Sequence, residues 1–178
     1  MEAKNRKRIF LAGPDVFYPD AAMRGRAMVE LCAGYGHQGI YPLDSLYPSG
    51  SKQEQACWIY SANTRLIDSC DLVIANLNPF RGEEPDSGTA FEVGYAIAKG
   101  KTVYGYLSDV RTQRARYGCA TDTEGRVIED FSLPINLMLG VPVSLVAGGL
   151  QEVLARINAS IEADRHRSAL KNRKGVGT

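Results

Sequence analysis

The sequence has little of the chemistry that indicates a metal site, a nucleic acid or a membrane. Of its 178 residues only two are histidines and four are cysteines, and no two cysteines form a C-x-x-C pair, so the pattern does not predict a zinc site. The net charge of +1 lacks the basic excess of a surface for nucleic acid or anionic lipid. No apolar run approaches the roughly 20 residues that span a bilayer, and the N-terminal residues carry no secretion signal. We therefore expect a cytoplasmic protein with reduced thiols and no metal, nucleic-acid or membrane partner.

The sequence does have enough apolar residues for one hydrophobic core. Its composition is 44% hydrophobic and 23% charged, which is typical of a globular domain of this length. We expect a single domain over residues 1–163. The remaining residues, 164–178, are basic and end in glycines, and this composition predicts a disordered tail.

Short apolar runs alternate with helical patterns along the chain. A parallel sheet with helices on both faces has this alternation, so we expect a five-stranded parallel sheet that is doubly wound, flavodoxin-like or Rossmann-like. Residues 109–130 are polar and lack periodicity, which predicts a long irregular excursion. The expected strands are 7–13, 38–43, 71–77, 102–107 and 141–146. The expected helices are 20–35 with Asp20 as N-cap, one that opens with the capping box Ser51-x-x-Glu54, 88–99 and 149–163.

Polar residues follow the expected strands, at the edge of the sheet where ligands bind. In open parallel sheets a ligand lies beyond the carboxyl ends of the strands, so these residues are candidates for a site. The helix that carries Glu92 begins at the same edge. The polar residues are Asp15, Asp44, Asn76, Asn78, Ser108 and Asp109.

Two carboxylates at the start of the helix 88–99 are the strongest candidates. Asp86 stands where an N-cap accepts backbone hydrogen bonds, and that alone would explain it, although one oxygen is free for a substrate hydroxyl. Glu92 has Gly88 and Ala96 as its i−4 and i+4 neighbours, so no intrahelical salt bridge accounts for it. A carboxylate among small and apolar residues is either paired across the structure or used in chemistry.

A carboxylate nucleophile suits displacement at the anomeric carbon of a sugar. The transition state resembles an oxocarbenium ion, which an adjacent anion stabilises before it bonds covalently. Retaining chemistry of this kind needs a second nucleophile to collect the sugar.

Four motifs in order resemble the nucleoside 2-deoxyribosyltransferases, and most closely their protozoan-type branch. The likeness runs from about residue 8 to 146 and implies transfer of 2-deoxyribose from a 2'-deoxynucleoside to a free purine or pyrimidine base, in nucleoside salvage and without a cofactor. The motifs are "IFLAGPDVF" (9–17), "DLVIANLNPFRG" (71–82), "PDSGTAFEVGYA" (85–96) and "LPINLM" (133–138).

The resemblance implies a role for each matching residue. Glu92 would be the nucleophile that forms the deoxyribosyl-enzyme intermediate, and Asp86 would hold a sugar hydroxyl. Asn136, accompanied by Met138, matches an asparagine that members of the family lend to the neighbouring subunit's site, which implies a homo-oligomer. Gly13 would let the backbone approach the ligand.

The base would lie against Asp15 and Phe17, and two departures from the family pattern concern its release. Asn63 stands where several bacterial members have an acid that protonates the leaving base, and an amide binds a base edge but supplies no proton. Phe10 stands where many members have a tyrosine that orients the nucleophile, so the resemblance places Phe10 among the substrate-binding residues. Asp15 is then a candidate proton donor, and a proton from solvent is the alternative.

Two other functions compete with transfer. One is a hydrolytic N-glycosidase that cleaves nucleosides or deoxynucleoside monophosphates, although Asp86 would repel a 5'-phosphate, which favours free nucleosides. The other is a non-catalytic nucleotide-binding module. In the loop that follows the third expected strand, Arg81 either pairs with Glu83 or Glu84 or helps to close the site.

Overall fold

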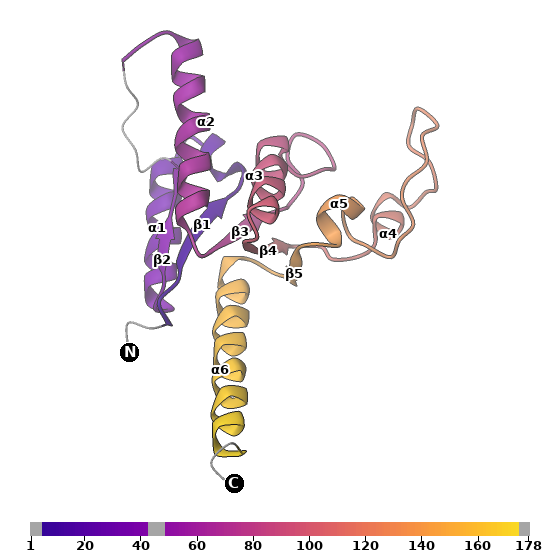
Figure 1. The fold of residues 1–178 in the computed structure, drawn as a ribbon. Helices are drawn as coiled ribbons and strands as arrows, with labels where there is room; N and C mark the ends of the chain where they lie inside the picture. The colour runs from indigo at the N-terminus through magenta and orange to yellow at the C-terminus, as the bar shows by residue number, and fades with distance from the viewer. Residues whose placement is uncertain (1–4, 43–48, 175–178) are drawn as a thin grey trace.

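Five strands form one parallel sheet in the computed structural model, which describes residues 5–42 and 49–174 (Figure 1). The strand order is β2-β1-β3-β4-β5 and every neighbouring pair is parallel, which confirms the predicted fold class in its flavodoxin-like form. Asp44 lies outside the described residues. The strands are β1 Arg8–Ala12, β2 Gln38–Ile40, β3 Leu72–Asn76, β4 Thr102–Leu107 and β5 Ser144–Ala147.

The central strands are apolar on both faces because both faces are covered. In β1, Ile9 and Leu11 pack into one core cluster while Phe10 and Ala12 pack into the other, as the two-residue period of a strand requires. A parallel sheet buried on both sides reads as a continuous apolar run for this reason.

Two helices cover each face of the sheet. Helices α1, Ala21–Gly34, and α6, Leu150–Lys174, share one cluster, and α2, Lys52–Ser69, and α3, Ser87–Ala98, share the other. The capping box at Ser51 is confirmed. The backbone N–H of Glu54 donates to the Ser51 hydroxyl, and the Glu54 carboxylate accepts the backbone N–H of Ser51. Asp20 occupies the N-cap position of α1, but its side chain accepts from Arg24 instead of a backbone amide.

The segment between β4 and β5 projects to the side of the sheet (Figure 1). It contains two short helices, α4, Gln113–Tyr117, and α5, Leu137–Gly140. The prediction of a long excursion here is therefore confirmed, apart from the single turn of α4 within it. Backbone and side-chain hydrogen bonds, for example from Arg114 to the Ile128 carbonyl at 3.0 Å, tie the excursion to itself.

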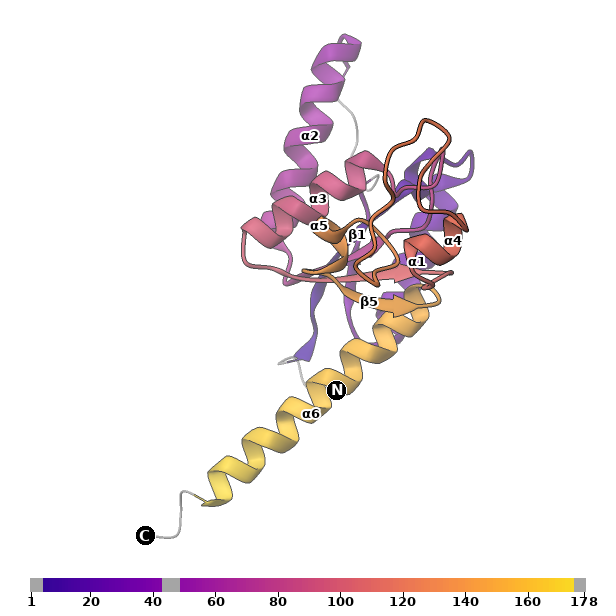
Figure 2. The same cartoon turned by 90° about the vertical axis from the view of Figure 1, so that its right-hand side faces the viewer.

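Helix α6 extends well past the sheet, where the sequence predicted a disordered tail (Figure 2). The expectation of disorder from residue 164 is wrong for residues 164–174, which are helical. One local interaction on this part of the helix is the pair of Arg167 with Asp164 at 2.7 Å, whose i,i+3 spacing adds a little to helix stability. This part of the sequence is polar and has no apolar stripe that would face the core. Its pattern therefore does not indicate a helix.

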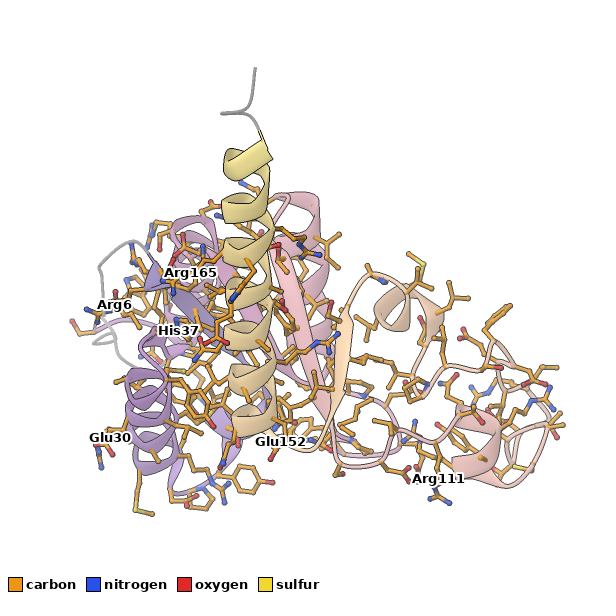
Figure 3. All side chains as sticks on the ribbon, turned by 90° about the horizontal axis from the view of Figure 1, so that it is seen from below. Arg6, Glu30, His37, Arg111, Glu152 and Arg165 are labelled. Carbon is orange, nitrogen blue, oxygen red and sulfur yellow. The ribbon has the colours of Figure 1, made fainter. Side chains whose placement is uncertain are left out.

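A buried histidine joins α6 to the start of the sheet. His37 lies between α1 and α6 (Figure 3), and its Nε2 is 3.0 Å from Oδ1 of Asn158 while its Nδ1 accepts the backbone N–H of Lys7 at 3.3 Å. Asn158 in turn donates to the carbonyl of Tyr35. These contacts need a neutral ring protonated at Nε2. Burial, helped by the charge of Lys7, lowers the pKa of His37, and the bond to Asn158 opposes that shift.

We expect His37 to make the fold sensitive to acid. Its folded pKa is below the usual value of 6.5, so as the pH falls through this value the unfolded state takes up a proton that the folded state resists, and stability is lost. The free-energy difference between wild type and His37→Gln, measured by urea unfolding, should therefore shrink as the pH falls from about 7.5 to about 5.5. His166→Gln, at the exposed histidine of α6, is the control. A constant difference for His37→Gln, or an equal trend for the control, would contradict this.

Candidate active site

Asp86 caps α3 with one carboxylate oxygen and leaves the other available. Its Oδ2 accepts the backbone N–H of Thr89 at 2.8 Å and the Thr89 hydroxyl at 2.9 Å. Its Oδ1 accepts no hydrogen bond from any of the described residues. The geometry therefore gives Asp86 both a cap and a free acceptor, which is the arrangement that a dual role needs.

Glu92 lies about 1.7 turns further along α3, half-buried beside a cavity of about 330 Å³ between α2 and α3. Its Oε1 accepts a hydrogen bond from Nδ2 of Asn63 at 3.0 Å. No ion pair reaches it from the part of the chain that the structure describes. Burial raises the pKa of Glu92 to about 7; the Asn63 bond opposes this shift and the charge of Asp86 adds to it.

The cavity beside Glu92 is largely apolar. Helix α2 supplies one wall and the first turns of α3 supply the other. Tyr60 and Phe91 face each other across the two helices with ring centroids 5.8 Å apart, so aromatic surface is available to a planar base. The lining residues are Ala56, Ile59, Tyr60, Asn63, Thr64, Ile67, Gly88, Phe91 and Glu92.

Asn63 is thus in the site, but its amide is directed at Glu92. The sequence placed it there as a contact for the base, and the structure shows it as the partner of the nucleophile candidate. Phe10, the other departure from the family pattern, is fully buried in the same core cluster as Val93. The prediction that Phe10 binds substrate is therefore wrong, because it presents no exposed surface and packs beneath α3 instead.

A second polar group lies at the carboxyl ends of β1 and β3, where the strand order reverses. Asn76 donates its amide to Oδ2 of Asp15 at 2.9 Å, and Arg24 lies 3.8 Å from Oδ1. Asn78 donates to Asn76, and Ser108 donates to Asn78. The hydrogen bonds thus form a series that runs from Ser108, just after β4, through Asn78 and Asn76 to Asp15. This series orients the Asp15 carboxylate as an acceptor.

Gly13, in the first motif, allows Asn76 and Asp15 to pack closely against the end of β1. A Cβ on Gly13 would stand 2.8 Å from Cβ of Asn76 and 3.2 Å from Oδ2 of Asp15. Only glycine therefore lets β1 and β3 approach so closely. The close approach that the sequence predicted for a ligand is made here by a protein side chain, and Gly13 does not line the described cavity beside Glu92.

Phe17 lies on the surface in a stack with Phe80. The ring centroids are 5.2 Å apart and the planes nearly parallel, and the Arg81 guanidinium lies over both rings, 5.1 Å from Phe17 and 4.6 Å from Phe80. Arg81 has a φ of +53°, a strained backbone for an arginine. No pair with Glu83 or Glu84 occurs among the described ion pairs, so the loop arginine stacks on aromatic rings. Neither Phe17 nor Asp15 lines the described cavity.

Asn136 forms the N-cap of α5 and is clamped by a glutamate that the sequence did not single out. Its Oδ1 accepts the backbone N–H of Met138 at 3.0 Å, and its Nδ2 donates to Oε1 of Glu129 at 2.6 Å. The other oxygen of Glu129 accepts the N–H of Leu137 at 2.9 Å. Glu129 belongs to the irregular excursion, where no periodicity indicates which residues meet, so no sequence signal pointed to it.

Met138 and Asn136 belong to α5 and its N-cap and are not part of the lining of the Glu92 cavity. Met138 is 73% exposed. Large apolar side chains of the same segment are exposed with it, including Phe131 at 62% and Val141 at 72%. Exposed apolar groups gathered on one projecting segment are typical of an interaction surface.

The described residues offer no obvious place for a metal ion. No group of three or more histidine, cysteine, aspartate or glutamate side chains among them is arranged to hold one. Within the same ranges, no helix combines the length and the apolar character needed to cross a membrane.

Comparison with known proteins places the chain in a family. The model of the nucleoside 2-deoxyribosyltransferase family matches residues 9–138. A 2-desoxiribosyltransferase from Leishmania mexicana is 35% identical, with a TM-score of 0.74 over 85% of this chain and 97% of that one. A conserved protein from Enterococcus faecalis V583, 22% identical with a TM-score of 0.57 over 87% of this chain and 99% of that one, shares the fold.

A curated relative agrees over part of its length. An uncharacterized protein of Schizosaccharomyces pombe is 36% identical over 107 residues, which is 58% of this chain and 51% of that protein. The chain thus spans about half the length of that relative. Asp86 and Glu92 both fall within the residues that the family model matches. The chain belongs to the nucleoside 2-deoxyribosyltransferase family.

Proposed function

We propose that the protein transfers 2-deoxyribose between nucleobases, in cytoplasmic nucleoside salvage, through a covalent ester on Glu92. In the first step a carboxylate oxygen of Glu92 bonds to the anomeric carbon while the glycosidic C–N bond breaks. The electron pair leaves with the base, which takes up a proton. In the second step a nitrogen of the acceptor base attacks the same carbon, the C–O bond to Glu92 breaks, and the acceptor loses a proton. No electrons are exchanged with a cofactor.

The observation that carries this proposal is the environment of Glu92. It is a carboxylate beside an apolar cavity of about 330 Å³, with a neutral hydrogen-bond partner and a pKa of about 7. A desolvated anion is a strong nucleophile, and a cavity of this size is at the lower end of the range for small ligands. The apolar and aromatic walls also offer a nucleobase a favourable contact surface, which favours a base over water as the second nucleophile.

The remaining candidate residues have roles that fit their hydrogen bonds. Oδ1 of Asp86 would accept a sugar hydroxyl. The donors around Asp15 suit an acceptor for a base N–H better than a proton donor, with Phe17 beside it. The leaving base would then take its proton from solvent.

One assay tests the reaction against its alternatives. The protein is incubated with deoxyinosine or thymidine and excess adenine, and the products are separated by chromatography. Formation of deoxyadenosine is expected. Release of free base alone would instead indicate a hydrolytic N-glycosidase, and binding without any turnover would indicate a non-catalytic module. The Leishmania mexicana relative, named as a transferase, supports the first outcome.

We also propose that the protein is a homo-oligomer in which Asn136 enters the neighbouring subunit's site. The exposed apolar side chains around Asn136 support this, because a partner would cover them. Mixing Glu92→Ala with Asn136→Ala, each inactive alone, should then restore activity. In a randomly exchanged dimer one site of each mixed pair is intact, so about a quarter of all sites should recover.

The matched control uses two residues of one helix. Glu92 and Asp86 both lie on or next to α3, so a mixture of Glu92→Ala with Asp86→Ala leaves every site defective and should recover nothing. Recovery in this control, or none in the Asn136 mixture after subunit exchange, would contradict a shared site.

A further inference from the structure

The hydrogen bond between Asn63 and Glu92 crosses from α2 to α3 and joins residues 29 apart in the chain, with Nδ2 3.0 Å from Oε1. Asn63 belongs to a stripe of α2 that lines the cavity with the spacing of one helix face. Within that stripe it is the one carboxamide, and Thr64 turns its hydroxyl to the Tyr60 carbonyl instead. The stripe is Ala56, Ile59, Tyr60, Asn63, Thr64 and Ile67.

The groups around Glu92 include no positive charge among the described residues. On α3 itself the charged neighbour is Asp86, whose charge opposes ionisation of Glu92. From α2, the titratable group at the cavity is the Tyr60 phenol. The strands beneath α3 contribute apolar core residues such as Phe10 and Val73. The Asn63 amide is therefore the donor that stabilises the carboxylate in this setting.

We propose that Asn63 is a positioning residue for Glu92: its amide fixes Oε1 and leaves Oε2 free to attack the anomeric carbon. This inference rests on the proposed function of Glu92 as nucleophile. Asn63 would replace the tyrosine hydroxyl whose place Phe10 occupies, because Phe10 has no donor and is fully buried.

A neutral donor suits both halves of the reaction. Glu92 is an anion before attack and a neutral ester afterwards, and an amide N–H can bond to Oε1 in either form. A lysine or arginine in this position would stabilise the anion much more than the ester, and would therefore slow the first step. An amide that holds one oxygen limits the carboxylate to one orientation, and misplacement of a reacting atom by about 1 Å costs about 100-fold in rate.

The test is the titration of Glu92 itself in the full-length Asn63→Leu protein. The carboxyl carbon is followed by 13C NMR and its signal is assigned by its loss in Glu92→Gln. Without the amide, the midpoint should move upward from about 7 by about one pH unit. The rising limb of kcat/KM against pH should move with it, and kcat at neutral pH should fall by about 10- to 100-fold. Deoxyinosine and thymidine should be affected equally as donors.

Thr64→Val is the matched control, because it removes a polar atom from the same stripe without touching Glu92. Its Glu92 midpoint should stay at the wild-type value. An unchanged midpoint in folded Asn63→Leu would overturn the inference. So would a change in donor preference and KM with the midpoint constant, since it would show that Asn63 binds the base. A shifted midpoint in a protein whose wild type transfers no sugar would support the contact and overturn the proposed function instead.

Discussion

Replacing Glu92 by glutamine is expected to abolish deoxyribosyl transfer and to stabilise the fold at neutral and alkaline pH. The amide keeps the size and one carbonyl oxygen of the side chain, which can still accept from Asn63. It cannot attack the anomeric carbon, so kcat/KM should fall by at least about 1,000-fold. A structural glutamate would give the opposite result, with activity retained and stability lost.

The stability gain follows from the shift of the Glu92 pKa from 4.5 in the unfolded chain to about 7 in the folded one. Below about pH 4.5 both states are protonated and there is no penalty. As the pH rises toward 7 the unfolded state releases its proton more readily, so stability is lost, and above about pH 7 the full penalty remains. Removing this charge should add about 1–3 kcal/mol at about pH 8, or several degrees in Tm.

The control for this variant is Glu30→Gln. Glu30 lies on the outer side of α1 and is exposed (Figure 3), and α1 covers the face of the sheet opposite to α2 and α3. Its replacement should change the free energy of unfolding by less than about 0.5 kcal/mol and leave transfer intact. Thermal unfolding at about pH 5 and about pH 8 provides an internal check, because the gain from Glu92→Gln should be small at the lower value. A destabilised Glu92→Gln protein at both values would contradict the burial argument.

The sheet and the helix that carries the two carboxylates could be predicted from the sequence for a physical reason. Strands buried on both faces, such as Leu72–Asn76, are apolar throughout and stop at polar residues. Asp86 is followed by small residues and a helical pattern, and a capping carboxylate is a local signal. Glu92 lacks any partner within reach on its own helix, and this too is read from local spacing.

The contacts that complete the site depend on tertiary structure and could not be predicted in this way. That Asn63 meets Glu92 depends on how α2 is rotated against α3. That Glu129 clamps Asn136 depends on the path of an irregular segment. The motif around Gly13 predicts that the backbone approaches a ligand there, whereas the group beside Gly13 in the structure is the side chain of Asn76. In each case a local pattern identified a residue and the packing of distant elements decided what it touches.

Replacing Asp86 by asparagine is expected to separate its cap from its role in binding. Asparagine keeps an oxygen for the amide of Thr89 and is as good an N-cap as aspartate, so the free energy of unfolding should change little. A sugar hydroxyl would lose a charged acceptor, which should lower kcat/KM by about 10- to 100-fold. Removing the charge also lowers the pKa of Glu92, so the rising limb of the pH profile should move to lower pH, opposite to the shift expected for Asn63→Leu.

Two comparisons make the Asp86 result specific. Ser51→Ala removes the N-cap of α2, far along that helix from Asn63, and should cost about 1 kcal/mol of stability without moving the pH profile. The second comparison uses deoxyinosine and its 5'-monophosphate as donors. If the Asp86 charge repels a 5'-phosphate, the monophosphate should be used poorly by the wild type and relatively better by Asp86→Asn. A wild type that prefers the monophosphate would contradict the assignment of Asp86 to the sugar. That result would also favour the alternative function, hydrolysis of deoxynucleoside monophosphates. A site for such a substrate must accept a negatively charged phosphate, which the Asp86 charge opposes.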